Sequence, residues 1–502
     1  VVEDGQIDFH PDRWKGVYLD WLRNIKDWCI SRQLWWGHRI PVWTCPDGHQ
    51  TASIEDITHC PTCQKPAEQD PDVLDTWFSS ALWPFATLGW PEKTPEFTYF
   101  YPTTVLSTAR DILYLWVARM VFSSMEFLDS IPFQHVVIHA TLLDSKGQRM
   151  SKSKGTGVDP LDMIAKYGAD ACRFWFAGAG TSSQDVRFSE EKLEAGRNFA
   201  NKLWNVSRFA LMNLPESDRV QAGELTLADR WILSRLHRTI QTVTEAIDSF
   251  TMVQATDALY DFIWGEFADW YIELAKSRMQ QGDETVRAVL REVLYATLRL
   301  MHPFMPFVTE EIHSTLVTRD LVPQRDSLLH AEWPVADASK IDPTAEAEMA
   351  LLMEAIRTVR NMRAELGIEP AKRAERLVVQ ATAASQDVYR KGASYLAHLT
   401  RTQEVSVTIE PQEIPLAASG VAGDATLLLP LAGLLDIAKE VERLRKEEAK
   451  LQGEREKLAA QLSNEAFVSK APEAVVAKLR NRQGEVAQAL QTVAGQIQRW
   501  QA

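Results

Sequence analysis

A short basic run, residues 146–154, constrains the fold of this chain more than any other feature. Four of its nine residues are Lys or Arg, two are Ser and none is acidic. An apolar, strand-like segment at 135–143 precedes the run, and Asp159-Pro160 has the pattern of a helix start directly after it. Gly147 and Gly155 allow the backbone to bend. A strand, a basic loop and a helix start in this order predict an α/β sheet with a phosphate site at the carboxyl end of a strand.

The composition of the run suits a polyphosphate ligand. Lys is a point-charge donor to phosphate, and Ser hydroxyls and backbone N–H groups add hydrogen bonds. The pattern Gly-x4-Gly-Lys-Ser/Thr is absent, so the run is not a P-loop. The alternative is a solvated basic loop, which the flanking strand and helix start disfavour.

Length and composition bound the class of protein. A chain of 502 residues with 45% hydrophobic and 24% charged residues predicts several globular domains. No apolar run approaches the roughly 20 residues that span a bilayer, so no membrane partner is expected. Five cysteines in so long a chain favour a reducing cytoplasm over a disulfide framework. The net charge of −14 argues weakly against nucleic acid as a partner, unless cations cluster locally.

Two short chelating pairs predict a structural zinc site. Cys45 and His49 form a Cys-x3-His pair, and Cys60 and Cys63 form a Cys-x2-Cys pair. Zinc takes four such ligands in a tetrahedron, and cytosolic thiolates at this spacing are more often metal ligands than disulfides. His59 competes with His49 as the fourth ligand, and free thiols are the alternative to metal.

The basic run contains a recognisable signature. Arg149-Met150-Ser151-Lys152-Ser153 resembles the Lys-Met-Ser-Lys-Ser signature of class I aminoacyl-tRNA synthetases. The segments Trp28–Pro41, Asp72–Ser80 and Asn198–Asn205 resemble the valine–tRNA ligases more than the isoleucine and leucine enzymes. The resemblance runs from near residue 10 to the C-terminus.

The resemblance and the residue patterns together imply a multidomain α/β plus all-α architecture. The parts expected are a connecting segment into the catalytic domain (1–44), a zinc knuckle insertion (45–70), the second half of a Rossmann-type catalytic domain (71–155), a stem-contact segment (156–188), a helical-bundle anticodon-binding domain (189–345), a small α+β domain (346–430) and a C-terminal antiparallel coiled coil that binds tRNA (431–502). Within the catalytic part, residues 97–102 have strand character and residues 111–122 read as an apolar helix.

The resemblance also implies ATP with Mg²⁺ as cofactor, although no carboxylate cluster marks a dedicated Mg²⁺ site. Lys152 is the expected main contact to the ATP phosphates. Asp111 and His139 are expected beside the nucleotide, although Ala109 replaces the glycine usual before Asp111, and a buried structural role is the alternative for His139. Trp77 is a candidate wall of the valine pocket, or else a core tryptophan. The expected remaining contacts of the loop are Arg149 and Lys154, with Ser151 and Ser153 as hydrogen-bond donors and Met150 as part of the signature.

Contacts to tRNA are expected in the C-terminal half. Arg357, Arg360 and Arg363 are three residues apart on one helix face and form a basic stripe, which either contacts phosphate or is simply solvated. Heptads in 434–458 and 476–500 flank a break that contains Pro472, a pattern that predicts an antiparallel helical hairpin.

One expected signature is not found. The chain has no match to the His-Ile-Gly-His signature, so we expect a C-terminal portion of a ligase, without the editing domain and inactive by itself. We also expect a monomer. The alternatives are an isoleucine or leucine ligase, and a non-catalytic tRNA-binding protein.

Overall fold

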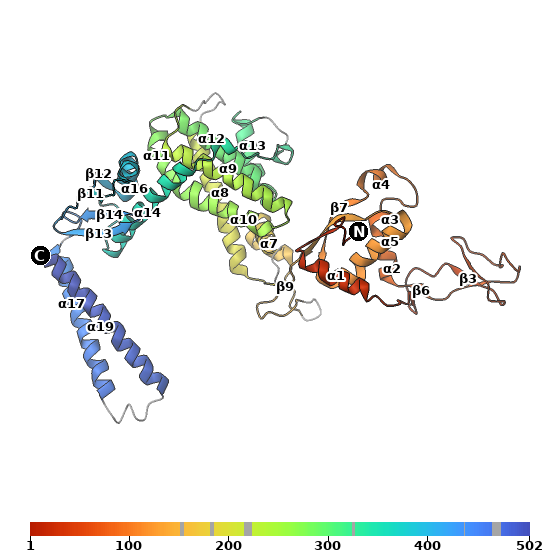
Figure 1. Cartoon of the computed structure of the whole chain (residues 1–502). Coiled ribbons are helices and arrows are strands. Elements are labelled where there is room, and N and C mark those ends of the chain that lie inside the picture. Colours follow the sequence, from red (N-terminus) through yellow and green to blue (C-terminus); the bar gives the residue numbers. More distant parts are fainter. Residues whose placement is uncertain are drawn as a thin grey trace. The chain divides into compact units, whose positions relative to one another are not determined.

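The computed structural model describes residues 1–150, 155–180, 185–214, 223–323, 327–435, 437–463 and 473–501 (Figure 1). Ser151, Lys152, Ser153 and Lys154 lie outside the described residues. The chain divides into two compact units, one of residues 1–218, 238–265 and 291–336, the other of residues 219–237, 266–290 and 337–502. Among the helices of the described residues, none combines the length and the apolar character that crossing a membrane requires.

A three-stranded parallel sheet forms the centre of the N-terminal part. Its order is β1-β8-β7, with β1 at Asp8–His10, β7 at Thr103–Ala109 and β8 at Phe133–His139. Helix α1 (Arg13–Arg23) packs on the same core, which includes the fully buried Val136. Residues 1–44, expected as a connecting segment, therefore contribute strand β1 to this sheet and helix α1 to its core.

Short helices surround the sheet, and one of them corrects a sequence prediction. Residues 97–102 were expected as a strand, but α4 is a helix because Thr94 caps it, accepting from the Phe97 N–H at 3.0 Å, and Pro95 occupies its first turn. The apolar helix expected at 111–122 is present, although it begins as a 3₁₀ turn and a π-helix. The helices here are α2 (Thr76–Ser80), α3 (Trp83–Ala86), α4 (Pro95–Phe100), η1 (Arg110–Ile112), η2 (Leu113–Val117) and α5 (Ala118–Leu128).

Small sheets carry the remaining strands of this part. A three-stranded antiparallel sheet in the order β4-β3-β5 underlies the cysteine pairs and defines the knuckle, residues 42–69. The strands are β2 (Ser31–Arg32), β3 (Val42–Thr44), β4 (Gln50–Ala52), β5 (Glu68–Gln69), β6 (Val73–Leu74), β9 (Leu142–Leu143) and β10 (Val186–Arg187).

The described residues between 160 and 340 are mostly helical, as their long apolar periodicities predict. Asp159 caps α6 as expected, accepting from the Leu161 N–H at 2.8 Å. The elements are α6 (Pro160–Tyr167), α7 (Ala169–Gly180), α8 (Glu190–Asn213), α9 (Leu227–Asp248), α10 (Met252–Tyr260), η4 (Asp261–Tyr271), α11 (Ile272–Gln280), α12 (Glu284–Met301), α13 (Pro306–Thr318), η5 (Leu328–His330) and η6 (Ala338–Lys340).

A mixed sheet with three helices follows. The strand order is β12-β11-β14-β13, with β11 parallel to β12 and antiparallel to β14. Helix α14 lies tightly against β13, since a Cβ at Gly420 would meet Thr358 Cγ2 at 2.6 Å. The elements are α14 (Pro343–Glu365), β11 (Ala374–Gln380), α15 (Gln386–Lys391), α16 (Ala393–Thr400), β12 (Thr402–Thr408), β13 (Ala417–Ala422) and β14 (Ala425–Pro430).

Two long helices end the described chain and run side by side in opposite directions (Figure 1). They are α17 (Ile437–Ser463) and α19 (Glu473–Gln501). Heptad positions meet between them, with Leu444 against Val493 and Ile497, and Leu458 in a second cluster. The expected reversal near Pro472 lies outside the described residues.

Candidate nucleotide and tRNA sites

The carboxyl ends of β7 and β8 bring two predicted residues to one edge of the sheet. Ala109 and His139 are register partners on these neighbouring parallel strands, and Asp111 follows in η1. His139 and Asp111 are both exposed, so His139 is not a buried structural residue. Ala109 has φ −83° and ψ 149°, an ordinary extended conformation, so this position does not need glycine for its backbone.

The signature loop, residues 144–155, begins as a tight turn. The Asp144 carboxylate accepts from the backbone N–H groups of Lys146 and Gln148 at 2.9 and 2.8 Å. Gly147 has φ +79°, and a Cβ there would lie 3.2 Å from Arg187 Nη2. The positive φ favours glycine at this bend, and the Arg187 side chain would have to shift slightly for a larger residue.

The structure brings Arg149 and Asp111 together as an ion pair. Their side chains are 64% and 38% exposed. A second pair joins Arg110 to Asp185 at 2.8 Å, so η1 is tied both to the loop and to the residue before β10. Sequence reasoning did not find Arg110 or Asp185, and no motif marks either residue.

Met150, the last described residue of the signature, lines an open cavity of about 780 Å³. Lys146 and Arg187 line the same cavity. Asp144, Glu190 and Glu191 also line it, so the cavity carries both signs of charge.

Trp77 lies half-buried on α2. Helix α2 packs against η2, which directly follows Asp111 in η1. The Trp116 indole N–H donates to the Ser80 carbonyl at 3.2 Å, so a second tryptophan lies beside α2. Sequence reasoning missed Trp116, whose position in the helix after Asp111 is the signal that could have found it.

Two segments that carry the family resemblance contact each other. Strand β2 pairs with β6, and Arg32 forms an ion pair with Asp75 at 2.5 Å. Asp75 also caps α2 by accepting from the Trp77 N–H at 2.8 Å. Arg119 stacks over Trp28, with its guanidinium carbon 3.3 Å from the ring centre, and burial lowers the pKa of this guanidinium. These contacts set the position of α2 and of Trp77.

The knuckle brings together Cys45, His49, Cys60 and Cys63. Their potential ligand atoms all lie within 4.8 Å of one another. The Cys45 sulfur is 3.6 Å from His49 Nδ1, and the Cys63 sulfur is 3.6 Å from the Cys45 sulfur. Tetrahedral bonds of about 2.0 to 2.3 Å give ligand separations of roughly 3.5 to 3.8 Å. The four residues therefore fit a zinc ion.

His59 is not a member of this group, because its ring lies 3.0 Å from the Thr58 hydroxyl instead. Cys45 and His49 close the β3–β4 turn, where the Cys45 N–H donates to the His49 carbonyl at 3.1 Å. The Cys63 N–H donates to the Cys60 sulfur and lowers the pKa of that thiol. A lowered pKa favours the thiolate form of Cys60. The hydrogen bond from the Lys65 N–H lowers the pKa of Cys63, but burial and the neighbouring Cys45 and Cys60 outweigh it and raise this pKa to about 11.

The predicted arginine stripe is divided by the packing of α14. The guanidinium carbons of Arg357 and Arg360 lie 5.2 and 5.7 Å from the centre of the Trp270 ring. Arg363 is only 6% exposed and donates to the Lys372 carbonyl oxygen. The three side chains therefore do not form a common solvent-facing stripe.

Three family models match successive parts of the chain. A family model for class I tRNA synthetases (I, L, M and V) matches residues 1–189, one for the anticodon-binding domain of tRNA ligase matches 229–379, and one for the valyl tRNA synthetase tRNA binding arm matches 436–501. The chain is 48% identical to a valine–tRNA ligase of Carboxydothermus hydrogenoformans, over 95% of this chain and 55% of that protein.

The chain belongs to the valine–tRNA ligase family.

A second valine–tRNA ligase, from Bacillus subtilis, is 44% identical over 96% of this chain and 55% of its own length. The chain thus spans about half the length of these curated relatives. Both relatives are named for valine, so the isoleucine and leucine alternatives are not favoured.

Two solved structures share the fold. One is LeuRS of Agrobacterium radiobacter K84 in a ternary complex with tRNA, with a TM-score of 0.52 and 19% identity, covering 65% of this chain and 45% of that one. The other is Mycobacterium tuberculosis methionyl-tRNA synthetase with methionyl-adenylate, with a TM-score of 0.50 and 19% identity, covering 66% of this chain and 65% of that one. The chain therefore has the class I catalytic fold with a helical anticodon-binding domain.

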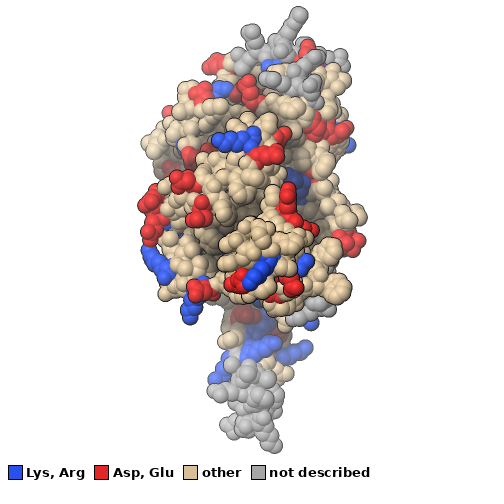
Figure 2. Space-filling view, turned by 90° about the vertical axis from the view of Figure 1, so that its right-hand side faces the viewer, with Lys and Arg blue, Asp and Glu red and all other residues tan. Residues whose placement is uncertain are grey.

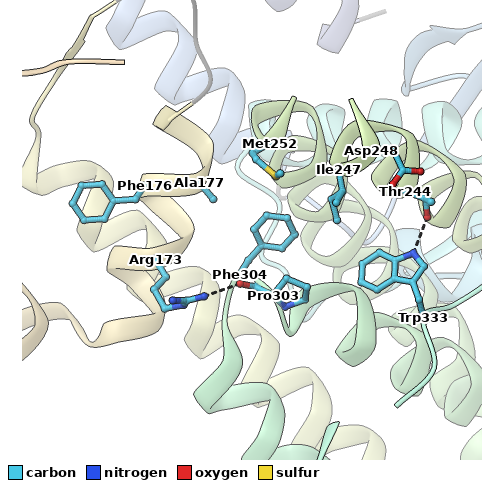
Figure 3. Close-up of a pocket in the computed structure, with 10 residues that line it drawn as sticks. All are labelled: Arg173, Phe176, Ala177, Thr244, Ile247, Asp248, Met252, Pro303, Phe304 and Trp333. Carbon is cyan, nitrogen blue, oxygen red and sulfur yellow. Dashed lines mark hydrogen bonds between the residues drawn. The ribbon is translucent and has the colours of Figure 1, made fainter. Parts of the chain in front are cut away.

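A separate cavity of about 680 Å³ lies among α7, α9 and α10 (Figure 3). Arg173 donates to the Pro303 carbonyl at 2.8 Å, and the Trp333 indole donates to the Thr244 hydroxyl at 2.8 Å. These polar groups are satisfied within the protein, and the remaining lining is largely apolar. We assign this cavity no part in the family's chemistry.

Proposed function

We propose that this chain takes part in the ATP-dependent ligation of valine to its tRNA through valyl-adenylate. The observation that carries the proposal is the order of the three family matches, from the class I catalytic model through the anticodon-binding domain to the tRNA binding arm. The proposal assigns to this chain the second ATP signature and the tRNA-contacting parts. A cytoplasmic location and a monomeric state belong to the same proposal.

In the first step the valine carboxylate attacks the α-phosphate of ATP, and pyrophosphate leaves. Negative charge grows on the phosphate oxygens, so positioning and electrostatic stabilisation supply most of the rate enhancement. We assign the main contact to Lys152, with Lys154, Ser151 and Ser153 as further donors. Mg²⁺ bound with ATP would neutralise part of the phosphate charge.

The ion pair with Asp111 neutralises Arg149 before ATP binds. Asp111 neutralises Arg149 at the edge of the sheet, near His139. When ATP binds, its phosphates compete with Asp111 for the guanidinium. Both side chains are well exposed, so exchanging one anion for another costs little free energy.

The second step transfers the valyl group to the terminal ribose of tRNA. Trp77 is proposed as part of the apolar wall that receives the valine side chain. The valine side chain has no polar atom, so the pocket must select it by shape and apolar contact. The half-burial of Trp77 and the nearby Trp116 support an apolar wall at this place.

A structural zinc ion is proposed in the knuckle, held by Cys45, His49, Cys60 and Cys63. Three thiolates and one imidazole leave no open position on a tetrahedral ion, which is typical of structural and not catalytic zinc. Its chemistry there is to cross-link the β3–β4 turn to the Cys60–Cys63 turn. Zinc analysis of freshly purified protein tests this assignment directly.

Contacts to tRNA must overcome an unfavourable overall charge. The chain carries a net charge of −14, and on the face that Figure 2 shows, acidic and basic side chains are interspersed among uncharged ones. Phosphate contacts are therefore expected at local groups of cations rather than across a broad basic surface. We retain Arg357 and Arg360 among the proposed tRNA contacts.

Exchange of labelled pyrophosphate into ATP tests the proposed function. We expect exchange that depends on valine when this chain is joined to the unmatched part of a relative such as the Carboxydothermus hydrogenoformans enzyme. Isoleucine and leucine serve as matched controls and should support far less exchange. Exchange that is absent from the joined protein, or equal with all three amino acids, would contradict the proposal.

A further inference from the structure

Three arginines from two helix ends line one small cavity in the α+β domain. Arg360 and Arg363 lie near the end of α14, and Arg401 directly follows α16. The cavity has a volume of about 260 Å³, and none of the eight described residues that line it is acidic. Sequence reasoning grouped Arg360 and Arg363 with Arg357, but the fold replaces Arg357 with Arg401.

Arg363 is held in place but is not fully satisfied. One terminal nitrogen, Nη2, donates to the Lys372 carbonyl oxygen. The other, Nη1, is buried and has no hydrogen-bond partner among the described residues. A buried charged donor without a partner is costly, and native proteins rarely keep one unless a ligand, an ion or water completes it.

The side chain of Arg360 and the backbone of Arg401 are held beside it. Arg360 Nε donates to the Leu399 carbonyl at 3.0 Å, and its guanidinium stacks near Trp270. Arg401 occupies a left-handed conformation, with φ +56°, as the residue that ends α16. Its backbone carbonyl accepts from the Ala374 N–H at 2.9 Å, which anchors it to β11.

The electrostatics of the cavity are those of an anion site. Burial, and then the positive charge of Arg401, lower the pKa of Arg363. The attraction of Glu273 partly offsets the effect of burial on Arg360, but Glu273 is itself paired with Lys276. Three positive charges held together without an acid in the lining repel one another, and an anion that enters the cavity stabilises them.

We propose that Arg360, Arg363 and Arg401 form a pocket that binds one phosphate group of the tRNA backbone. Planar guanidinium groups suit the bidentate recognition of phosphate. A volume of about 260 Å³ is below the roughly 300 to 1,000 Å³ of sites that enclose drug-sized ligands, so a single phosphate fits better than a nucleotide.

Sequence position favours RNA over a free anion as the source of this phosphate. The pocket residues at 360–370 lie inside the anticodon-binding match, near its C-terminal end, and those at 399–401 lie between that match and the tRNA binding arm match. Arg401 falls outside both matches. This choice of ligand rests on the proposed function, whereas the pocket itself rests on geometry alone.

A binding experiment with the full chain and labelled tRNA tests the proposal. The affinity of the chain for tRNA is measured over a series of salt concentrations. Arg401→Asn removes the charge while keeping a residue that tolerates the left-handed conformation. Arg401→Lys retains the charge without the bidentate fork. Arg390→Gln is the matched control, because Arg390 is exposed on α15 of the same domain and pairs only weakly with Asp387, at 3.4 Å.

We expect Arg401→Asn to weaken tRNA binding roughly tenfold at low salt, and to reduce the slope of log affinity against log salt by about one. Arg401→Lys should fall between Arg401→Asn and the wild-type chain, and Arg390→Gln should match the wild type. Arg360→Gln should repeat the Arg401→Asn result from the other helix. Equal affinities and slopes in wild type, Arg401→Asn and Arg360→Gln would overturn the proposal.

A second experiment measures binding of inorganic phosphate to the chain. The ³¹P line width of phosphate is recorded at constant ionic strength. Broadening with the wild-type chain that disappears in Arg401→Asn supports the pocket. If that broadening occurs while tRNA binding is unaffected by Arg401→Asn, the ligand is a free phosphate and the RNA assignment is overturned. If the wild-type chain binds no tRNA, the proposed function fails in its tRNA step, and the ³¹P arm still decides whether the pocket binds phosphate.

Discussion

The knuckle and the signature loop are both short turns in the N-terminal part, yet their polar groups are arranged in opposite ways. In the knuckle, four ligand atoms converge within 4.8 Å of one another. In the loop, Arg149 is turned toward Asp111 and Lys146 faces an open cavity. Convergent groups repel or remain unsatisfied until an ion binds, so they suit a resident ligand. Dispersed, neutralised charges suit a substrate that must also leave.

Removing one zinc ligand from the knuckle should change the protein more than any other substitution proposed below. Cys60→Ser should reduce bound zinc from about one per chain to almost none, because structural zinc in small peptides contributes about 10 to 16 kcal/mol to folding. We expect limited proteolysis to cut within residues 42–69 of the variant, as after chelation of the wild type. Cys29→Ser, at an exposed cysteine outside the group, is the control. Equal zinc content in both variants would show that Cys60 is not a zinc ligand.

The next effect concerns the chemistry of the loop. Lys152→Ala, in the protein joined to the unmatched part of a relative, should slow pyrophosphate exchange about 100- to 1,000-fold, as expected when a transition-state donor is removed. Thermal unfolding should hardly change, in contrast to Cys60→Ser. Lys93→Ala, an exposed lysine of the same part, should leave exchange unchanged. Exchange within a few-fold of normal in Lys152→Ala would remove this residue from the site.

A smaller effect tests whether the loop is held weakly. Asp111→Asn breaks the ion pair with Arg149, whose side chain is 64% exposed. The free energy of unfolding should fall by only about 0 to 1 kcal/mol, the usual value of an exposed pair. Urea unfolding measures this, with Asp185→Asn as a matched disruption of the neighbouring pair to Arg110. A loss of several kcal/mol would mean that the loop, like the knuckle, is a structural unit.

The smallest effect is a pH dependence at the helix that follows the loop. Glu190, at the start of α8, binds Lys166 of α6, and this hydrogen bond lowers the pKa of Glu190 below 4.5 and raises that of Lys166. The contribution of Glu190 is therefore present above about pH 4.5 and is lost as the pH falls through the lowered pKa. The Lys166 contribution is lost only at strongly alkaline pH.

Urea midpoints of Glu190→Gln and wild type measured from pH 3 to 8 test this. The difference should be small at neutral pH, since both side chains are about half exposed, and should vanish in acid. A difference that grew as the pH fell would reverse the assigned sign.

Local stereochemistry made part of this fold predictable. Asp159-Pro160 predicted the start of α6, and the chelating pairs predicted a Cys/His group, because both depend on neighbours within a few residues. The choice between His49 and His59 could not be made from spacing. It depends on the pairing of β3 with β4, which places His49 beside Cys45.

The missed features depend on contacts that are distant in sequence or on competing local signals. The aromatic residues at 97–101 favour a strand, but the cap at Thr94 and Pro95 outweighs them. The helical pattern placed Arg363 correctly on α14, yet its burial depends on the sheet that begins at Ala374. The pairing of Arg149 with Asp111 joins residues that no periodicity connects.

The two terminal helices have a consequence for distance. Helix α17 contains 27 residues, which corresponds to about 40 Å along its axis at 1.5 Å per residue. Because its apolar residues meet α19 at heptad positions, removing seven residues from each helix would keep the seam in register. Such a deletion would shorten the pair by about 10 Å and change its reach without changing its surface chemistry. The length of this helix pair can therefore be changed in steps of one heptad.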